Sequence, residues 1–164
     1  MFFDESRFGT HSKIGHGWFI RGSRTQVKFN MGFKNFYVYS AVNSNSGNDF
    51  SLIMPYVDTQ CMNIFLDKLV KESPDTQYLM VMDGASWHRS YHLKVPASIE
   101  IIYLPPYSPE LNPVERLWNH VKQHTIKNKF YDSLAGLERV VCEFLKQIKP
   151  ETVQSICACS YLYS

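Results

Sequence analysis

The sequence lacks several features that would indicate whole classes of protein. It has no apolar run of about 18 residues, so no membrane-spanning helix is expected. Its N-terminus, MFFDESRFG, lacks the charged-then-apolar pattern of a secretory leader, and a cytoplasmic location is therefore expected. The four cysteines contain no CxxC pair, which argues against a cysteine zinc site and favours reduced thiols. No internal repeat or low-complexity tract occurs.

Acidic residues are absent from two windows of the chain. None stands between Glu5 and Asp49, and none between Glu115 and Asp132. The basic residues of these windows are Arg7, Lys13, Arg21, Arg24, Lys28 and Lys34, then Arg116, Lys122, Lys127 and Lys129. The segment from Asp49 to Glu115 instead holds nine carboxylates. If the fold joins the two windows, they form a phosphate-binding surface beside an acidic pocket; otherwise they are merely solvated charges.

The 164 residues, 45% of them hydrophobic and 15% aromatic, are enough for one domain over residues 1–164 with a substantial core. Strand-like segments come first, at 2–6, 17–20, 26–30, 35–43 and 50–54. A helical period follows at 57–69. Apolar strands come next at 78–82 and from 99 to the stop at Pro105 and Pro106, and then helices at 111–126 and 134–148. This order predicts an α/β fold in which a mixed five-stranded sheet, an antiparallel meander plus two parallel strands, is flanked by helices.

Three acidic residues occupy informative places in this scheme. Asp4 lies in the first strand, Asp83 ends an apolar strand just before Gly84, and Glu115 stands at the start of a helix. Ligands gather beyond the carboxyl ends of parallel strands in open α/β sheets. Three carboxylates that converge there repel one another, and a divalent cation relieves the repulsion. The alternative for Asp83 is a structural cap on the turn into ASWHRS.

The stretch YLPPYSPELNPVERLW fixes where Glu115 lies. Pro113 disfavours a helical Asn112, so the helix is expected to begin at Asn112. Asn112 and Glu115 then match a capping box, in which Glu115 only bonds back to the Asn112 amide. In the other interpretation, Glu115 lies at the margin of the apolar stripe of its helix, and its carboxylate points toward the sheet as a ligand. The prolines then fix the register of that helix.

The segments FFDESRFG, GWFIRGSR, LMVMDGASWHRS and IYLPPYSPELNPVERLWNHVK resemble the catalytic domain of IS630-type transposases, within the IS630/Tc1/mariner group of DDE transposases. The resemblance covers roughly residues 2–127 and is most specific in the proline-rich block. It implies an RNase H-like fold in which Asp4, Asp83 and Glu115 hold two Mg²⁺ or Mn²⁺ ions. The 31 residues between Asp83 and Glu115 fit the spacing of the group.

The resemblance also implies a reaction and its partners. The expected function is metal-dependent DNA strand cleavage and strand transfer on double-stranded DNA, with a TA target, in a homodimer or larger complex near the nucleoid. Members of the group carry helix-turn-helix regions ahead of the catalytic domain, whereas here Asp4 follows Met1 closely. We therefore expect either a split transposase with an upstream-encoded helix-turn-helix partner, or a truncated, catalytically silent remnant that binds DNA or multimerises. A ribonuclease H or a Holliday-junction nuclease is disfavoured, because the proline-rich block is not their signature.

DNA contacts are expected mainly at phosphates, with little sequence readout. The candidate residues are Arg7, Arg21, Arg24, Lys28, His88, Arg116 and Lys122. For His88 the alternatives are a residue that orients a phosphate or water and a plain surface histidine. Trp18 and Trp118 are expected in the core.

Overall fold

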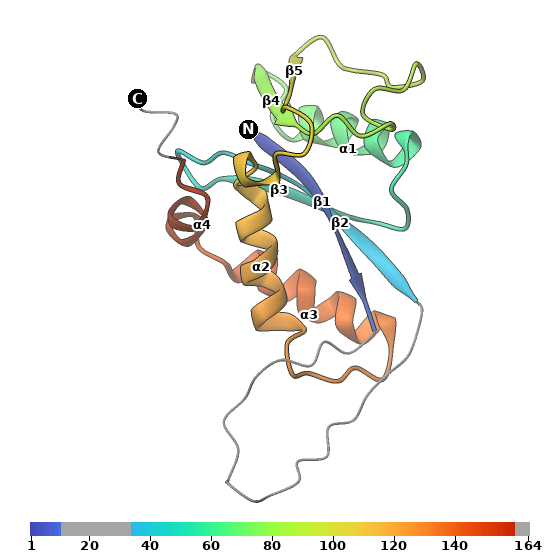
Figure 1. The fold of residues 1–164 in the computed structure, drawn as a ribbon, viewed down its shortest axis with the longest axis vertical. Coiled ribbons are helices and arrows are strands. Elements are labelled where there is room, and N and C mark those ends of the chain that lie inside the picture. The colour runs from blue at the N-terminus through green and yellow to red at the C-terminus, as the bar shows by residue number, and fades with distance from the viewer. Residues whose placement is uncertain (11–33, 160–164) are drawn as a thin grey trace, which may run out of the picture.

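The computed structural model describes residues 1–10 and 34–159. Five strands, four α-helices and one 3-10 turn follow one another along this part of the chain (Figure 1). They are β1 (Phe2–Gly9), β2 (Asn35–Val42), β3 (Asp49–Met54), α1 (Thr59–Glu72), β4 (Tyr78–Met82), β5 (Ile99–Tyr103), η1 (Pro109–Leu111), α2 (Val114–Thr125), α3 (Leu134–Gln147) and α4 (Pro150–Cys157). The strands predicted at 17–20 and 26–30, together with Trp18, lie outside the described residues.

The strands form one mixed sheet in the order β3-β2-β1-β4-β5. β1 pairs antiparallel with β2, and β2 pairs antiparallel with β3. On its other side β1 runs parallel to β4, which runs parallel to β5. The predicted sheet of three antiparallel and two parallel strands is therefore confirmed. The short helix α4 was not expected.

Each face of the sheet carries its own apolar core. α1 packs on one face, and α2, α3 and α4 pack on the other (Figure 1). Because side chains alternate along a strand, β1 sends Phe2 and Phe8 toward α2 and sends Phe3 toward α1. Trp118 of α2 is 1% exposed and packs edge-on against Phe8, which confirms its place in the core.

The parallel half of the sheet is covered less completely than its sequence predicts. Met80 and Met82 of β4 are fully buried beneath α1. On the opposite face, Leu79 of β4 is 48% exposed and Ile102 of β5 is 46% exposed. On that face β4 is covered only in part, because Val81 packs against the core beneath α2 whereas Leu79 remains half exposed.

The structure bears on the cysteines and on the search for membrane-spanning helices. The four cysteines are free thiols; Cys61, Cys157 and Cys159 are buried and Cys142 is partly exposed. Across residues 1–10 and 34–159, no helix is long and apolar enough to cross a membrane.

Candidate active site

Asp4 of β1 and Asp83, just after β4, occupy equivalent positions in the pairing of these two parallel strands. Phe2 of β1 pairs with Val81 of β4, and each aspartate stands two residues further along its own strand direction. Both therefore reach the same edge of the sheet, where a pocket of about 310 Å³ opens. Glu115 from α2 lines this pocket as well. Three carboxylates that are distant in sequence thus surround one pocket.

Asn112 ties the beginning of α2 to β1. Its buried side chain donates from Nδ2 to the carbonyl oxygen of Phe3 (2.8 Å) and accepts at Oδ1 from the backbone N–H of Val114 (3.2 Å). Its backbone N–H donates to the carbonyl of Pro109 (3.0 Å), so that amide is not available to Glu115. The capping-box alternative is therefore wrong. α2 begins at Val114 instead of Asn112, and exposed Glu115 stands in its first turn.

Replacing Asn112 by Ala is expected to destabilise the fold by about 1–3 kcal/mol, since the buried carbonyl of Phe3 loses its donor. Urea-induced unfolding of the variant measures the change. Asn119, exposed on the same helix, supplies the matched control. Asn119→Ala should leave the free energy of unfolding within about 0.5 kcal/mol of the wild type. Equal stability of the two variants would show that the bond to Phe3 does not anchor α2.

Asp4 lies partly buried between β1 and α2. Its Oδ2 accepts a hydrogen bond from Nε1 of Trp118 (2.9 Å). Burial, followed by the charges of Glu115 and Glu5, raises the pKa of Asp4 to about 8. Within residues 1–10 and 34–159, Asp4, Asp83 and Glu115 form no ion pair with a Lys or Arg. Ionised Asp4 is therefore held in an environment that favours a nearby cation.

Asp83 makes its contacts through one carboxylate oxygen. Oδ1 accepts from the backbone N–H of Ala85 (3.1 Å) and lies 2.7 Å from Nδ1 of His88. The hydrogen bond with His88 lowers the pKa of Asp83, despite the opposing effect of burial. The bond to Ala85 means that Asp83 does cap the turn after β4. This structural role uses Oδ1 and is compatible with a ligand at Oδ2.

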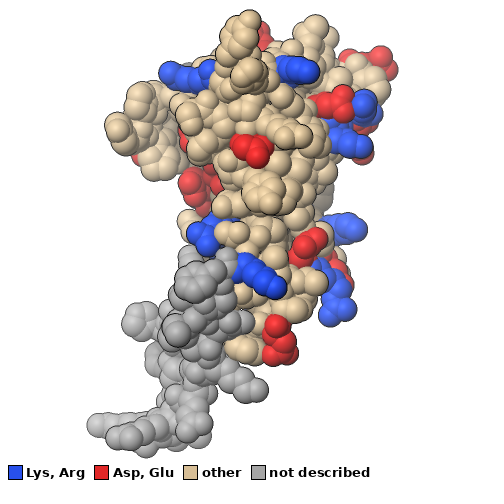
Figure 2. All heavy atoms as spheres, turned by 90° about the vertical axis from the view of Figure 1, so that its right-hand side faces the viewer, with Lys and Arg blue, Asp and Glu red and all other residues tan. Residues whose placement is uncertain are grey.

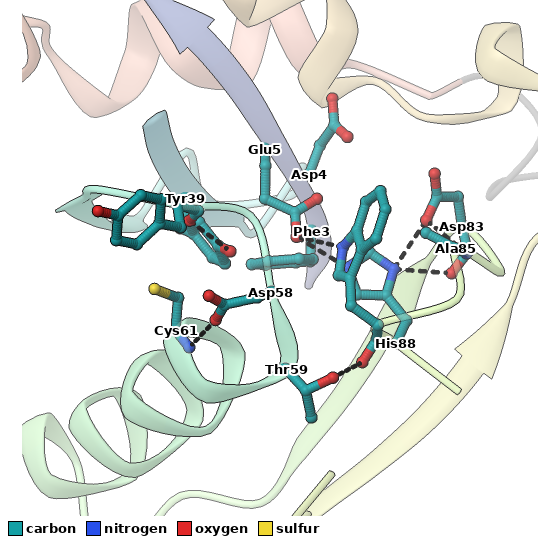
Figure 3. Close-up of polar contacts among 12 residues, drawn as sticks. Phe3, Asp4, Glu5, Tyr39, Asp58, Thr59, Cys61, Asp83, Ala85 and His88 are labelled. Atoms are coloured by element: carbon teal, nitrogen blue, oxygen red, sulfur yellow. Dashed lines mark hydrogen bonds and ion pairs between the residues drawn. The ribbon is translucent and has the colours of Figure 1, made fainter. Parts of the chain in front are cut away.

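His88 is enclosed between two carboxylates. Its side chain is 1% exposed, with Nε2 lying 2.8 Å from Oε1 of Glu5 and Nδ1 facing Asp83 (Figure 3). Burial lowers the pKa of His88, but hydrogen bonds and charge from Asp83 and Glu5 outweigh burial and raise the pKa to about 10. The interpretation as a surface histidine is wrong. Its predicted DNA contact also loses its basis, because both ring nitrogens are occupied.

The match to known families agrees with this geometry. Residues 1–138 match the family described as DDE superfamily endonuclease. The chain belongs to this family. An uncharacterized protein of Sinorhizobium fredii, y4pE/y4sA, is 35% identical over 96 residues, which are 58% of this chain and 71% of that protein. The uncharacterized 39 kDa protein of insertion element IS630 from Shigella sonnei is 27% identical over 153 residues, or 90% of this chain and 44% of that protein.

Solved structures show the same fold. The Mos1 transposase paired-end complex with left transposon end superposes with a TM-score of 0.70 at 14% identity, over 95% of this chain and 50% of that one. The catalytic domain of Mos1 mariner transposase gives a TM-score of 0.63 at 13% identity, over 95% of this chain and 74% of that one. The expected RNase H-like fold is confirmed, and this DDE superfamily chain shares the fold of the Mos1 transposase catalytic domain. It spans about half the length of the Mos1 chain in that complex.

The carboxylates of the DDE domain surround one pocket without converging on one point. In the described part of the chain, no three His, Cys, Asp or Glu side chains gather closely enough to hold a metal ion as they stand. Asp4 is turned onto Trp118, and Asp83 is turned onto His88. The expectation of carboxylates within a few ångströms of a common point is therefore not met. The donor set itself fits a hard divalent cation, because such ions prefer carboxylate oxygens. Within the described residues no Lys or Arg forms an ion pair with these carboxylates, and His88 pairs with Asp83 through Oδ1 alone.

The candidate DNA-binding residues of the DDE domain lie in different settings. Arg116 donates from Nη2 to the carbonyl of Ala158 (2.7 Å), which ties its guanidinium to the segment after α4. Lys122 places Nζ 5.5 Å from the ring centre of Phe8, beside the end of β1. Arg7 is exposed on β1. The remaining candidates, Arg21, Arg24 and Lys28, lie outside the described residues.

Sequence reasoning missed Arg89, which lines this pocket, and Glu5, which connects to Asp83 through His88. Strand alternation points Glu5 to the opposite face of β1 from Asp4, and from that face it reaches His88. Arg89 lines the pocket, packs against Gly84 and lies 4.7 Å above the ring of Tyr103. The signal for Arg89 was its place six residues after Asp83, in the loop that leaves the site. No pattern in the sequence pairs Glu5 with His88, because the contact spans 83 residues.

Proposed function

We propose that this chain cleaves DNA strands and joins the freed ends to a target, as the catalytic domain of an IS630-like transposase. The observation that carries the proposal is the pocket at the sheet edge, which is lined by Asp4 of β1, Asp83 at the end of β4 and Glu115 of α2. Each carboxylate is anchored by a different element, so the set is assembled only in the folded chain. Its membership of the DDE family supplies the reaction class.

In this proposal the three carboxylates hold two Mg²⁺ or Mn²⁺ ions. Two such ions would activate a water or a DNA 3′-hydroxyl and stabilise the leaving oxygen of an in-line displacement. The chain contributes position: Trp118 directs Asp4, the turn at Ala85 directs Asp83, and Asn112 sets where α2 carries Glu115. No side chain acts as a covalent nucleophile in this scheme.

The solved neighbours support the choice of cofactor and partner. Mos1 mariner paired-end complexes have been solved with Mn and with Mg, at TM-scores of 0.68 and 0.71. Other Mos1 structures are a paired-end complex with the left transposon end and a strand transfer complex. By analogy we propose that this chain takes the same metals, acts on the double-stranded ends of its own element and on a TA target, and works in an assembly of at least two copies. A helix-turn-helix partner or segment would supply recognition of the ends.

A DNA surface is proposed at the end of the molecule where β1 finishes and β2 begins. Thr10 and Lys34 meet there through a backbone hydrogen bond (3.3 Å), and Lys122 of α2 lies beside Phe8. Lys122, from the second basic window, therefore lies at the same end of the molecule as Thr10 and Lys34, the residues on either side of 11–33. Elsewhere the charges are mixed: on the face in Figure 2, basic and acidic side chains alternate around a broad uncharged area. Among the described residues, Lys34 of the first basic window and Lys122 of the second lie at this end of the molecule.

The proposed function predicts Mg²⁺-dependent nicking of DNA that carries the ends of the element. The assay uses the complete transposase, with any separate DNA-binding partner added, and follows conversion of a supercoiled donor plasmid to nicked and joined products. Chelation by EDTA should abolish both products, and added Mg²⁺ or Mn²⁺ should restore them. Products that persist in EDTA would contradict a reaction supported by metal ions at these carboxylates.

A further inference from the structure

Side-chain contacts connect the face of β1 that packs against α1 with the DDE pocket. Glu5 lies on the α1 side of β1, whereas Asp4 lies on the α2 side. His88 bridges from Glu5 to Asp83, at 2.8 Å from Oε1 of Glu5 and 2.7 Å from Oδ1 of Asp83 (Figure 3). We call the side chains of Glu5 and His88 together the Glu5–His88 clasp.

The clasp is fixed from several sides. Nε1 of Trp87 donates to Oε1 of Glu5 (3.2 Å), the same oxygen that faces the His88 ring. Phe3 meets the His88 ring edge-on, with 5.6 Å between ring centres. The hydroxyl of Tyr103, at the end of β5, donates to the His88 carbonyl (2.6 Å). These contacts leave the imidazole one orientation, with Nδ1 directed at Asp83.

The consequence for Asp83 is that its two oxygens have different environments. Oδ1 takes the contacts with Ala85 and His88. Oδ2 has no hydrogen bond within residues 1–10 and 34–159, and the side chain is 60% exposed at the pocket. Without the clasp, one hydrogen bond from a backbone amide would hold this exposed carboxylate. With it, one face of the carboxylate is fixed and the other remains for a ligand.

We propose that the Glu5–His88 clasp is a positioning device for the DDE site. It holds Asp83 through Oδ1, so that Oδ2 is presented to a divalent cation. The inference rests on the proposed function, because it needs Asp83 as a metal ligand. Carboxylate ligands of metal sites are commonly hydrogen-bonded by a second layer of side chains that orient them. Glu5 is thereby connected to the site although it lies on the opposite face of β1 from Asp4.

Two substitutions of His88 separate positioning from packing. In His88→Asn the side-chain amide occupies the place of Nδ1 and still donates to Asp83. In His88→Gln the longer amide occupies the place of Nε2, meets Glu5 and loses Asp83. We expect His88→Gln to weaken Mn²⁺ binding by about 10-fold or more, and His88→Asn to stay closer to the wild type. Isothermal titration of the full chain with Mn²⁺ measures both, with thermal melting in EDTA beside it.

A double-substitution cycle completes the test. In an Asp83→Asn background, His88→Gln should cause no further loss of Mn²⁺ affinity. His92→Gln, at an exposed position in the same loop, is the matched control and should bind Mn²⁺ as the wild type does. Equal losses from the Gln and Asn variants of His88, or unchanged or tighter binding by His88→Gln, would overturn the clasp. If Asp83→Asn itself binds Mn²⁺ normally, the proposed metal site is overturned and this inference with it.

Glu5→Ala provides a second route if neither His88 variant folds. It leaves the ring in place and removes the acceptor that orients Nε2. The expected result is weaker Mn²⁺ binding that disappears as an effect in the Asp83→Asn background. An equal loss in both backgrounds would mean that Glu5 acts through its charge alone, and would overturn its role in the clasp.

Discussion

Glu115→Gln is expected to leave the domain folded and to abolish Mg²⁺-dependent strand nicking and joining. Glu115 is exposed at the pocket, and the Asn112 amide bonds to Pro109, so no capping bond is lost. A neutral amide cannot offset the charge of bound cations. We expect a loss of roughly 10²–10³-fold or more in rate, the range found when one preorganised transition-state contact is removed. The plasmid nicking assay with the complete transposase measures it.

Glu110 provides the control for this experiment. It is an exposed acidic residue of η1, five positions before Glu115, and it is not among the residues that line the pocket. Glu110→Gln should nick and join at the wild-type rate. Thermal melting of both variants ensures that a loss of activity does not reflect unfolding. A folded Glu115→Gln protein that nicks as fast as the wild type would remove Glu115 from the DDE set.

Asp4→Asn is expected to have two opposite effects, more stability without metal and loss of the response to metal. The pKa of Asp4 is raised to about 8, above its value in an unfolded chain. The folded state therefore binds the proton more tightly, and its stability falls as pH rises from about 4 to about 8. Asn does not ionise, so this fall should be absent in the variant. At pH 8 in EDTA its Tm should exceed that of the wild type by several degrees, since 1 kcal/mol corresponds to about 2–4 °C in a domain of this size.

The same melting experiment then adds Mn²⁺ at pH 8. Binding to the folded state should raise the Tm of the wild type by mass action and leave Asp4→Asn nearly unchanged. Asp75→Asn, at an exposed position between α1 and β4, is the matched control and should melt as the wild type does throughout. If Asp4→Asn melts below the wild type in EDTA and responds equally to Mn²⁺, Asp4 is a structural residue instead of a ligand.

The placement of the three acids could be predicted from the sequence because it depends on the backbone. Asp83 follows from the end of an apolar strand and Glu115 from the proline-rich approach to α2, whereas Asp4 was assigned from the family resemblance. The register that brings Asp4 beside Asp83 is seen only in the structure. The directions of their side chains could not be predicted. They depend on contacts between residues far apart in sequence, such as Trp118 with Asp4 and His88 with Glu5. A lone histidine after Asp83 carries no sign of the buried carboxylate that faces it.

In the fold too, strands and helices could be predicted from local sequence, whereas exposure that depends on packing between distant segments could not. The apolar run of β4 predicts a strand correctly, but the exposure of Leu79 depends on where α2 packs. The helix predicted at 134–148 is confirmed as α3, and its Leu137 and Val141 are buried within the α2 side of the core. The helix α4 was missed because it has only 8 residues, although Pro150 at its start is a recognised helix signal.

The most direct test of the central claim is a crystal structure of the full chain grown with Mn²⁺, with the metal located by its anomalous scattering. The account predicts two peaks about 3.5–4 Å apart in the pocket at the sheet edge, bounded by carboxylate oxygens of Asp4, Asp83 and Glu115. Asp83 should keep Oδ1 on His88 and turn Oδ2 toward a peak. Saturating Mn²⁺ that gives no peak in this pocket, or peaks only at other carboxylates, would contradict the assignment of these three residues.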